Sequence, residues 1–387
     1  MDGLSIASAL LALAYLLLLG LKAAGAASVL RRRPPRRRQQ TPFDGTGVAI
    51  LQPILGGDPL LPQVLQHTLQ ALPGAHFLWL LDQADAPGRA TAEALCSAHR
   101  QHRITCLLHP AAPQGINPKT FKLDAVLPRV EEPVLLVLDD DARLSAPALA
   151  QMVDELRHAD LVTALPCYRD DGAAGARLMA QFVNNNAAPT YLGLLPWLSP
   201  LSINGMCYAM HTARLRELGG FAPLRHMLAD DLALARALRS QHARLHQSTA
   251  CVEVQTHVPT LPRYVLQMHR WMLFALLLLR DERPALRALI GVLHGLPPLL
   301  LWGLLVLAVL PPFGLPGVVA AAVLVLRAGT LAALQRRASG RARHRPLASL
   351  IAELLQPLHL LHAACSRRIR WRTHVYRVHG NDQFDEV

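Results

Sequence analysis

Carboxylates that could bind a metal ion or move protons occur in three groups along this sequence: Asp82 with Asp85, Asp139 to Asp141, and Asp230 with Asp231. The middle group follows VLLVL at 134–138, an apolar run typical of a strand buried on both faces. In an extended chain Asp139 and Asp141 point the same way. A divalent cation with oxygen ligands would relieve their repulsion. We therefore predict that Asp139 and Asp141 bind Mg²⁺ or Mn²⁺; a solvated acidic turn is the alternative.

Strands and helices alternate around these groups. Apolar runs predict strands at 48–51, 77–81, 104–108, 134–138 and 161–165. Helical patterns lie at 60–72, 91–102, 122–127, 145–157, 228–240 and 261–280. This alternation predicts an α/β fold with a parallel, doubly wound sheet. Ligands of such sheets bind at the carboxyl ends of the strands, so we expect the acidic groups to share one edge.

The composition indicates a soluble domain joined to membrane segments. Of the 387 residues, 52% are hydrophobic, and mean hydropathy is +0.24. Because the net charge is +12, nucleic acid has to be considered as a binding partner. However, the arginines adjoin apolar runs and aromatic residues make up only 5%, which favours anionic lipid headgroups as partners and argues against nucleic acid. The six cysteines contain no CxxC pair, and we predict reduced thiols.

Apolar runs flank the predicted sheet domain. Residues 4–21 can cross a bilayer, and the arginine run at 31–38 follows them. Because basic residues favour the cytoplasmic side, we predict an uncleaved anchor and a cytoplasmic domain, in an integral, multi-pass protein of a bacterial inner membrane. Two further spans are predicted at 286–310 and 313–334, whereas 347–365 either crosses or re-enters the membrane. The predicted organisation is an anchor (1–30), a basic linker (31–46), the cytoplasmic domain (47–260), an interfacial helix (261–282), a transmembrane or re-entrant region (283–366) and a basic tail (367–387).

Several motifs resemble those of membrane-bound inverting glycosyltransferases with a GT-A fold, in particular the ceramide glucosyltransferase family. They are QPILGGDP (52–59), GINPK (115–119), DDDAR (139–143), ADD (229–231), QMHRW (267–271) and the tail IRWRTHVYRVHG (369–380). Bacterial hopanoid-type glycosyltransferases share much of this pattern. The family carries its first aspartate in a Gln-Asp-Pro-Asp-Asp-like stretch, while this chain has LDQADAP. Either Asp82 or Asp85 could therefore contact the nucleotide.

The resemblance implies roles for the acidic groups. A cation on Asp141, with Asp139 at the same metal or at the nucleotide ribose, would neutralise the departing diphosphate. Asp231 would be the general base that takes the proton of the acceptor hydroxyl, and Asp230 would raise its proton affinity. The alternative for Asp230 and Asp231 is a purely structural one, because carboxylates favour the first turn of any helix.

The resemblance also implies roles for basic and aromatic residues. Lys119 in GINPK could reach the diphosphate; a surface lysine is the alternative. Arg270 would pair with the diphosphate, Trp271 would stack on the acceptor, and Gln267 would position both. The alternative is that Arg270 and Trp271 only anchor the helix at the membrane interface, where such residues are common. We expect His269 to be structural, and Arg372 and Arg377 to add positive charge to the site or to hold lipid headgroups.

We therefore predict a metal-dependent hexosyltransferase that moves glucose or N-acetylglucosamine from a UDP-sugar to a lipid hydroxyl in the bilayer. A hopanoid or other lipid glycosyltransferase and a polysaccharide synthase are the enzymatic alternatives. An inactive membrane scaffold that binds sugar nucleotides is the non-enzymatic one. The sugar, the lipid, the choice of metal and the oligomeric state are left open by the sequence.

Overall fold

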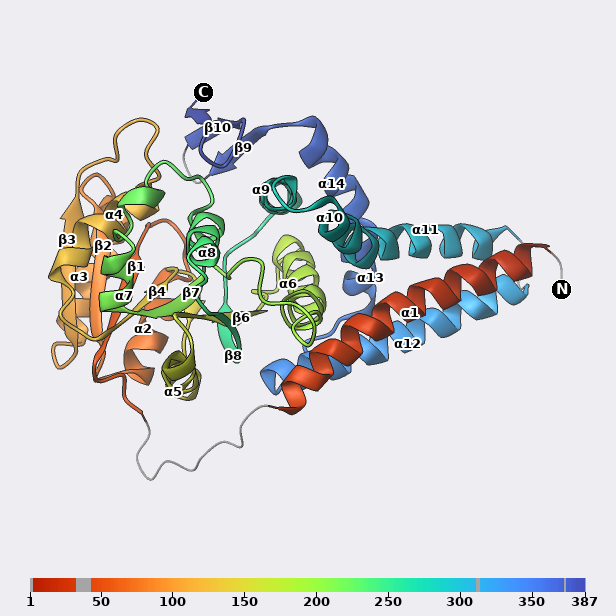
Figure 1. Cartoon of the computed structure of the whole chain (residues 1–387), viewed down its shortest axis with the longest axis horizontal. Helices are drawn as coiled ribbons and strands as arrows, with labels where there is room; N and C mark the ends of the chain where they lie inside the picture. Colours follow the sequence, from red (N-terminus) through yellow and green to blue (C-terminus); the bar gives the residue numbers. More distant parts are fainter. Residues whose placement is uncertain (1–2, 33–42, 311–313, 372–373, 387) are drawn as a thin grey trace. The chain divides into compact units, whose positions relative to one another are not determined.

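The computed structural model describes residues 3–32, 43–310, 314–371 and 374–386 (Figure 1). Most of the predicted basic linker, the prolines at 311–312 and Arg372 lie outside the described residues. The described part of the chain forms two compact units. We call one the sheet unit (34–171, 199–258 and 368–387) and the other the helical unit (1–33, 172–198 and 259–367).

The sheet unit is built on a mixed sheet. In the described residues eight strands pair in the order β3-β2-β1-β4-β7-β6-β8-β5. Their bounds are β1 (Val48–Pro53), β2 (His76–Asp82), β3 (Arg103–His109), β4 (Val134–Leu138), β5 (Ala142–Arg143), β6 (Leu161–Tyr168), β7 (Cys207–His211) and β8 (Leu245–Val254). β1 is parallel to β2 and β4, while β7 runs antiparallel between β4 and β6. All five predicted strands are confirmed; β5, β7 and β8 were not predicted.

Short helices connect these strands. They are α2 (Leu61–Ala71), α3 (Ala86–Ala98), α4 (Pro118–Val126), α5 (Ala146–Glu155), α7 (Thr212–Glu217) and α8 (Asp230–Ser240). A separate antiparallel sheet near the C-terminus joins β9 (Arg368–Trp371), β10 (His374–Val378) and β11 (Phe384–Glu386).

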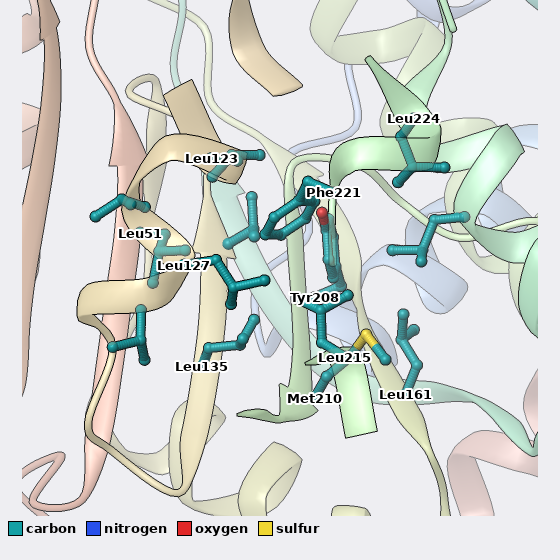
Figure 2. Close-up of a cluster of buried hydrophobic side chains, with 14 of the residues drawn as sticks. Leu51, Leu123, Leu127, Leu135, Leu161, Tyr208, Met210, Leu215, Phe221 and Leu224 are labelled. Carbon is teal, nitrogen blue, oxygen red and sulfur yellow. The ribbon is translucent and has the colours of Figure 1, made fainter. Parts of the chain in front are cut away.

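The core of the sheet unit lies between one face of the sheet and the helices α4, α7 and α8. Alternate strand residues such as Leu135 and Val137 face the same side, as the pleat requires. They pack with Leu123 of α4, Leu215 of α7 and other buried side chains of this cluster (Figure 2). Leu234 and Leu238 of α8 belong to the same cluster. Burial of these leucines fixes α8, and with it the acidic pair at the start of that helix.

The helical unit contains the candidate membrane segments. Its elements are α1 (Gly3–Arg31), α6 (Ala174–Ala187), the π-helical turn η3 (Ala188–Leu192), α9 (Leu261–Arg280), α10 (Pro284–Ile290), the π-helical turn η5 (Gly291–Gly295), α11 (Leu296–Val309), α12 (Leu315–Ser339), α13 (Pro346–Leu354) and α14 (Gln356–Cys365). Within the described residues, four helical stretches are long and apolar enough to cross a membrane: Gly3–Arg31, Pro284–Val309, Leu315–Ser339 and Pro346–Cys365. α1 packs beside α11 and α12 (Figure 1).

A buried polar network ties three of these helices together. Arg327 of α12 donates to the Glu353 carboxylate of α13 at 2.6 Å, and Tyr15 of α1 donates to the same carboxylate at 3.0 Å. Arg327 also donates to the carbonyl of Ser349 at 3.0 Å. Charges inside a membrane protein are costly unless they are paired in this way. The stretch at 347–365 changes from α13 to α14 at Leu355, and both predicted alternatives, a crossing and a re-entrant segment, remain predictions.

Candidate active site

Lys119 joins the second and third acidic groups. Asn117 caps α4 by accepting from the Lys119 backbone N–H at 2.9 Å, which places Lys119 in the first turn. The Lys119 ammonium lies 2.9 Å from Asp139 Oδ1 and 3.5 Å from Asp230 Oδ2, and it donates to the Gly205 carbonyl at 3.0 Å. Asp139 and Gly205 thus accept hydrogen bonds from the ammonium, while Asp230 lies at ion-pair distance. The expected contact of Lys119 with a diphosphate remains a prediction.

Burial and neighbouring charges act in opposite directions on Lys119. Its side chain is only 15% exposed, and burial by itself would lower the lysine pKa. The negative charges of Asp139 and Asp230 outweigh burial and raise the Lys119 pKa well above its ordinary value. The ammonium is therefore charged at neutral pH and screens the two carboxylates from each other.

The three aspartates after β4 form a turn, in which the Ala142 N–H donates to the Asp139 carbonyl at 3.1 Å. The expected extended chain is therefore wrong here, because the turn closes the backbone on itself and the period of two does not apply. Each carboxylate holds a different segment. Asp140 accepts from the Leu55 N–H at 2.7 Å in the loop after β1, while Asp141 accepts from the Thr256 hydroxyl at 2.5 Å.

The donor set suits a cation that arrives with a phosphate-bearing ligand. Among the described residues, no group of three or more His, Cys, Asp or Glu side chains is placed to hold a metal ion. Mg²⁺ sites commonly use one or two protein carboxylates, with substrate phosphates and waters completing the shell. Asp139 and Asp141 supply two hard oxygen ligands of the kind that Mg²⁺ and Mn²⁺ prefer. By donor type these residues match such a cation, and their role as its ligands remains a prediction.

The first acidic group contains two carboxylates with different partners. Asp85 caps α3 by accepting from the Gly88 N–H at 3.1 Å, and its other oxygen accepts from the Gly56 N–H at 2.7 Å. A Cβ atom at Gly56 would lie 2.3 Å from the Gly88 nitrogen, so only glycine allows this approach. Asp82, at the end of β2, pairs with Lys122 at 2.9 Å. Asp85 therefore braces the loop, which leaves Asp82 as the better candidate for the nucleotide.

Asp230 and Asp231 begin α8. Asp230 is buried, whereas Asp231 is half-buried and its carboxylate accepts from the Leu232 N–H at 2.8 Å. Burial, followed by the charge of Asp230, raises the pKa of Asp231 to about 6, against the opposing effect of Lys119. A Cβ atom at Gly205 would lie 2.8 Å from the Asp231 side chain. Asp231 thus has the proton affinity that a base working near neutral pH needs.

Several polar residues around these groups were missed by the sequence reasoning. Tyr208 of β7 is buried beneath the acidic groups, and burial together with the charge of Asp230 raises the pKa of its phenol. The His257 ring Nδ1 lies 2.6 Å from Asp171 Oδ2, and the backbone N–H of His257 donates to the Asp58 carboxylate at 3.0 Å. Asn117 could have been found, because an asparagine before a proline is a typical helix start. Tyr208 and His257 lie in strand or loop patterns that carry no such signal.

The QMHRW residues lie on α9 in the helical unit. The buried face of this helix carries Met268 and His269, and the His269 ring lies 4.1 Å from that of His362 on α14. Trp271 stacks on Phe182 of α6 with ring centres 6.2 Å apart. Gln267 and Arg270 are half-buried. The expected roles of Gln267, Arg270 and Trp271 remain predictions.

One expectation about cysteines is wrong. Cys167 of β6 and Cys251 of β8 are joined in a disulfide, where the sequence predicted reduced thiols. These strands are neighbours in the sheet, which the sequence separation of 84 residues concealed.

Comparisons with known proteins agree with this architecture. The model of glycosyl transferase family 21 matches residues 5–384. Ceramide glucosyltransferase 1 of Caenorhabditis elegans is 26% identical over 208 residues, which are 52% of this chain and 44% of that protein. The match therefore spans less than half of the relative's length.

A solved structure supports the fold. The mannosyltransferase PcManGT from Pyrobaculum calidifontis, in complex with GDP-Man and Mn²⁺, has a TM-score of 0.53 and 17% identity, over 94% of this chain and 98% of that one. At this identity the likeness concerns the fold alone, and it confirms the predicted GT-A class.

Proposed function

The chain belongs to glycosyl transferase family 21, and on that premise we propose that it moves a hexose, glucose or N-acetylglucosamine, from a UDP-sugar to the hydroxyl of a membrane lipid. The observation that carries this proposal is the Lys119 ammonium between Asp139 and Asp230. It brings the acidic group proposed to bind the donor next to the group that contains the proposed base. The similarity to a protein named ceramide glucosyltransferase supports glucose and a ceramide-like lipid.

In the proposed reaction Asp231 acts as the general base. The acceptor oxygen attacks the sugar C1 from the face opposite the diphosphate, and its proton passes to the Asp231 carboxylate. The C1–O bond to the diphosphate breaks, UDP leaves with the electron pair, and the anomeric centre is inverted. The pKa of about 6 supports this role, because Asp231 is ionised at neutral pH and still binds a proton well.

The remaining residues would bind the donor and the acceptor. Asp139 and Asp141 would hold Mg²⁺ or Mn²⁺, which when bound neutralises charge on the diphosphate. Asp82 would accept a hydrogen bond from the uracil or the ribose, while Lys119 and Arg270 would add positive charge. Trp271, positioned with Gln267, would form the wall for the acceptor.

We also propose that the sheet unit lies in the cytoplasm, at the inner membrane of a bacterium. The four candidate membrane stretches support a membrane protein, and the arginine run at 31–38 favours this orientation. Anionic lipid headgroups would bind the basic segments. A lipid acceptor fits these features, since its hydroxyl would already lie at headgroup depth.

The test is to incubate the purified full chain with UDP-glucose, UDP-N-acetylglucosamine or GDP-mannose, and with ceramide, hopanoid or total lipid extracts. Each reaction is run with Mn²⁺, with Mg²⁺ or with a chelator, and new glycolipids are identified by mass spectrometry. We expect a hexosylated lipid in the reactions with a UDP-sugar and a metal ion, and no product in the reactions with a chelator. Transfer from GDP-mannose alone would overturn the donor assignment. Binding of nucleotides without transfer to any lipid would favour the scaffold alternative.

A further inference from the structure

The backbone just before the acidic pair is held by asparagines from distant parts of the sequence. Asn117, in the GINPK motif, donates from its side chain to the carbonyls of Met227 at 2.9 Å and Leu228 at 3.3 Å. Its own N–H donates to the carbonyl of Arg225 at 2.7 Å. One side of the segment that leads into α8 is thereby fixed.

Asn381 holds the same segment from the C-terminal sheet. Its main-chain carbonyl accepts from the Leu228 N–H at 2.7 Å. Its side-chain Oδ1 accepts from the Ala229 N–H at 2.7 Å, while its Nδ2 donates to the Ala229 carbonyl at 3.2 Å. The amide of Asn381 therefore pairs with both polar groups of Ala229. At 9% exposure the residue is buried, so these hydrogen bonds are shielded from competing water.

The position of Asn381 is itself well defined. It lies in the turn between β10 and β11, and this turn is closed by N–H groups of His379 and Gly380 that donate to the Gln383 carbonyl at 2.9 and 3.0 Å. β11 pairs with β10 on the other side of the turn. Asn381 is therefore presented to Ala229 by a hydrogen-bonded hairpin.

Ala229 is the residue immediately before α8. It has no polar side chain with which to fix its own backbone, and the two carboxylates follow it directly. Any rotation about Ala229 would move the first turn of α8, and with it Asp231. Misplacement of a reacting group by about 1 Å can cost on the order of 100-fold in rate.

We propose that Asn381 is a positioning residue for the Asp230–Asp231 pair, so that the turn between β10 and β11 helps to hold the catalytic centre in place. The inference rests on the proposed function, in which Asp231 is the base. It deepens that function by assigning the tail a task beyond the contribution of positive charge.

The test compares three variants of the full chain. Asn381→Ala removes both side-chain hydrogen bonds. Asn381→Asp keeps the shape and the acceptor for the Ala229 N–H, but it places a carboxylate oxygen against the Ala229 carbonyl. Gln383→Ala is the matched control, because Gln383 lies exposed in the same turn.

We expect Asn381→Ala to lower kcat roughly 10- to 100-fold, with the donor KM changed by less than about 3-fold because donor groups are untouched. The added negative charge in Asn381→Asp should move the acidic limb of the pH–rate profile to higher pH. Gln383→Ala should behave as the wild type. The inference would be overturned if Asn381→Ala had the kcat of the wild type. It would also be overturned if the loss of kcat only matched the fraction of unfolded protein and Asn381→Asp kept the wild-type pH profile.

A second measurement does not depend on activity. Amide hydrogen exchange in peptides that cover 226–233 should be faster in Asn381→Ala than in the wild type, and unchanged in Gln383→Ala. Unchanged exchange in Asn381→Ala would contradict the inference. The two proposals can fail separately. If Asp231→Asn retained full transfer, the assignment of Asp231 as the base would be wrong. If Asp231→Asn lost transfer and Asn381→Ala retained it, only the role of Asn381 would be wrong.

Discussion

The Lys119 ammonium lies 2.9 Å from the Asp139 carboxylate, and this ion pair connects two motifs that the sequence presents as separate features. The same ammonium reaches Asp230 at 3.5 Å. Without a cation between them, the two carboxylates would repel each other. The lysine therefore offsets negative charge in the acidic cluster.

Lys119→Met should damage both stability and the pH profile. The free energy of unfolding should fall by roughly 3 kcal/mol or less, since a broken buried pair leaves carboxylates without their partner but Asp139 is 30% exposed. Because Lys119 lowers the pKa of Asp231, its removal should shift the acidic limb of the pH–rate profile upward. Thermal unfolding and kcat against pH measure the two effects. Lys119→Arg, which keeps the charge, should retain most of the stability.

Asp231→Asn should lower transfer by roughly 100-fold or more, the usual contribution of a general base, while donor binding remains. The measurement is product formation beside equilibrium binding of UDP. Asp154→Asn is the control, because Asp154 lies exposed on α5 with only a surface ion pair to Arg157. Equal losses in both variants would indicate a general charge effect and not a base.

The activity should depend on pH through Asp231. Below a pH of about 6 the carboxyl binds a proton and can no longer accept one from the acceptor, so kcat should rise with pH through this value and then level off. Enzyme exposed to acid and returned to neutral pH should recover, which separates titration from unfolding. A flat profile across this range would contradict the assignment.

Asp82 and Asp85 should respond differently to substitution. Asp85→Ala removes a helix cap and the brace to Gly56, and should cost about 1–2 kcal/mol of stability. Asp82→Asn should instead raise the KM for the UDP-sugar. It also removes the carboxylate that pairs with the buried Lys122 ammonium, so it too should lower stability. Donor titration distinguishes the two variants. If Asp85→Asn raised the KM for the UDP-sugar and Asp82→Asn left it unchanged, the nucleotide contact would be assigned to Asp85 and not to Asp82.

Arg327→Leu should destabilise the helical unit. The Glu353 side chain, which is 13% exposed, would lose its pairing with Arg327, and the loss of one partner from a buried pair typically costs about 3–5 kcal/mol. The expected result is a lower unfolding temperature in detergent. The double substitution Arg327→Leu with Glu353→Leu should recover part of it, because the Glu353 carboxylate is no longer left without its Arg327 partner. If the double variant were less stable than the single one, the pair would not be the cause.

The family, the GT-A class and the predicted strands could be obtained from the sequence because apolar runs and short motifs are local signals. β4 illustrates this, since its five apolar residues are all buried. The ceramide glucosyltransferase resemblance is confirmed by the family match over 5–384. In the structure the Lys119 ammonium contacts the carboxylates of both Asp139 and Asp230, while the roles of these three residues remain predictions.

Long-range partners could not be obtained in this way. Asp140 binds Leu55, Asp141 binds Thr256, and Asn381 binds Ala229. None of these pairs leaves a periodic pattern, because each is fixed only when the sheet brings distant segments together. The segment Gly172–Leu198 belongs to the helical unit, although the sequence placed it inside the domain 47–260. Its helix α6 has the composition of an ordinary amphipathic helix, which does not reveal what it packs against.

The hydrogen bonds between Asn381 and Ala229 also have a consequence for biosynthesis. All of the candidate membrane stretches after α8 lie between these two residues in the chain. Those stretches are therefore synthesised before the last restraint on the acidic pair can form. In a nascent chain that has not yet reached Asn381, we expect the acidic pair to be placed as loosely as in Asn381→Ala.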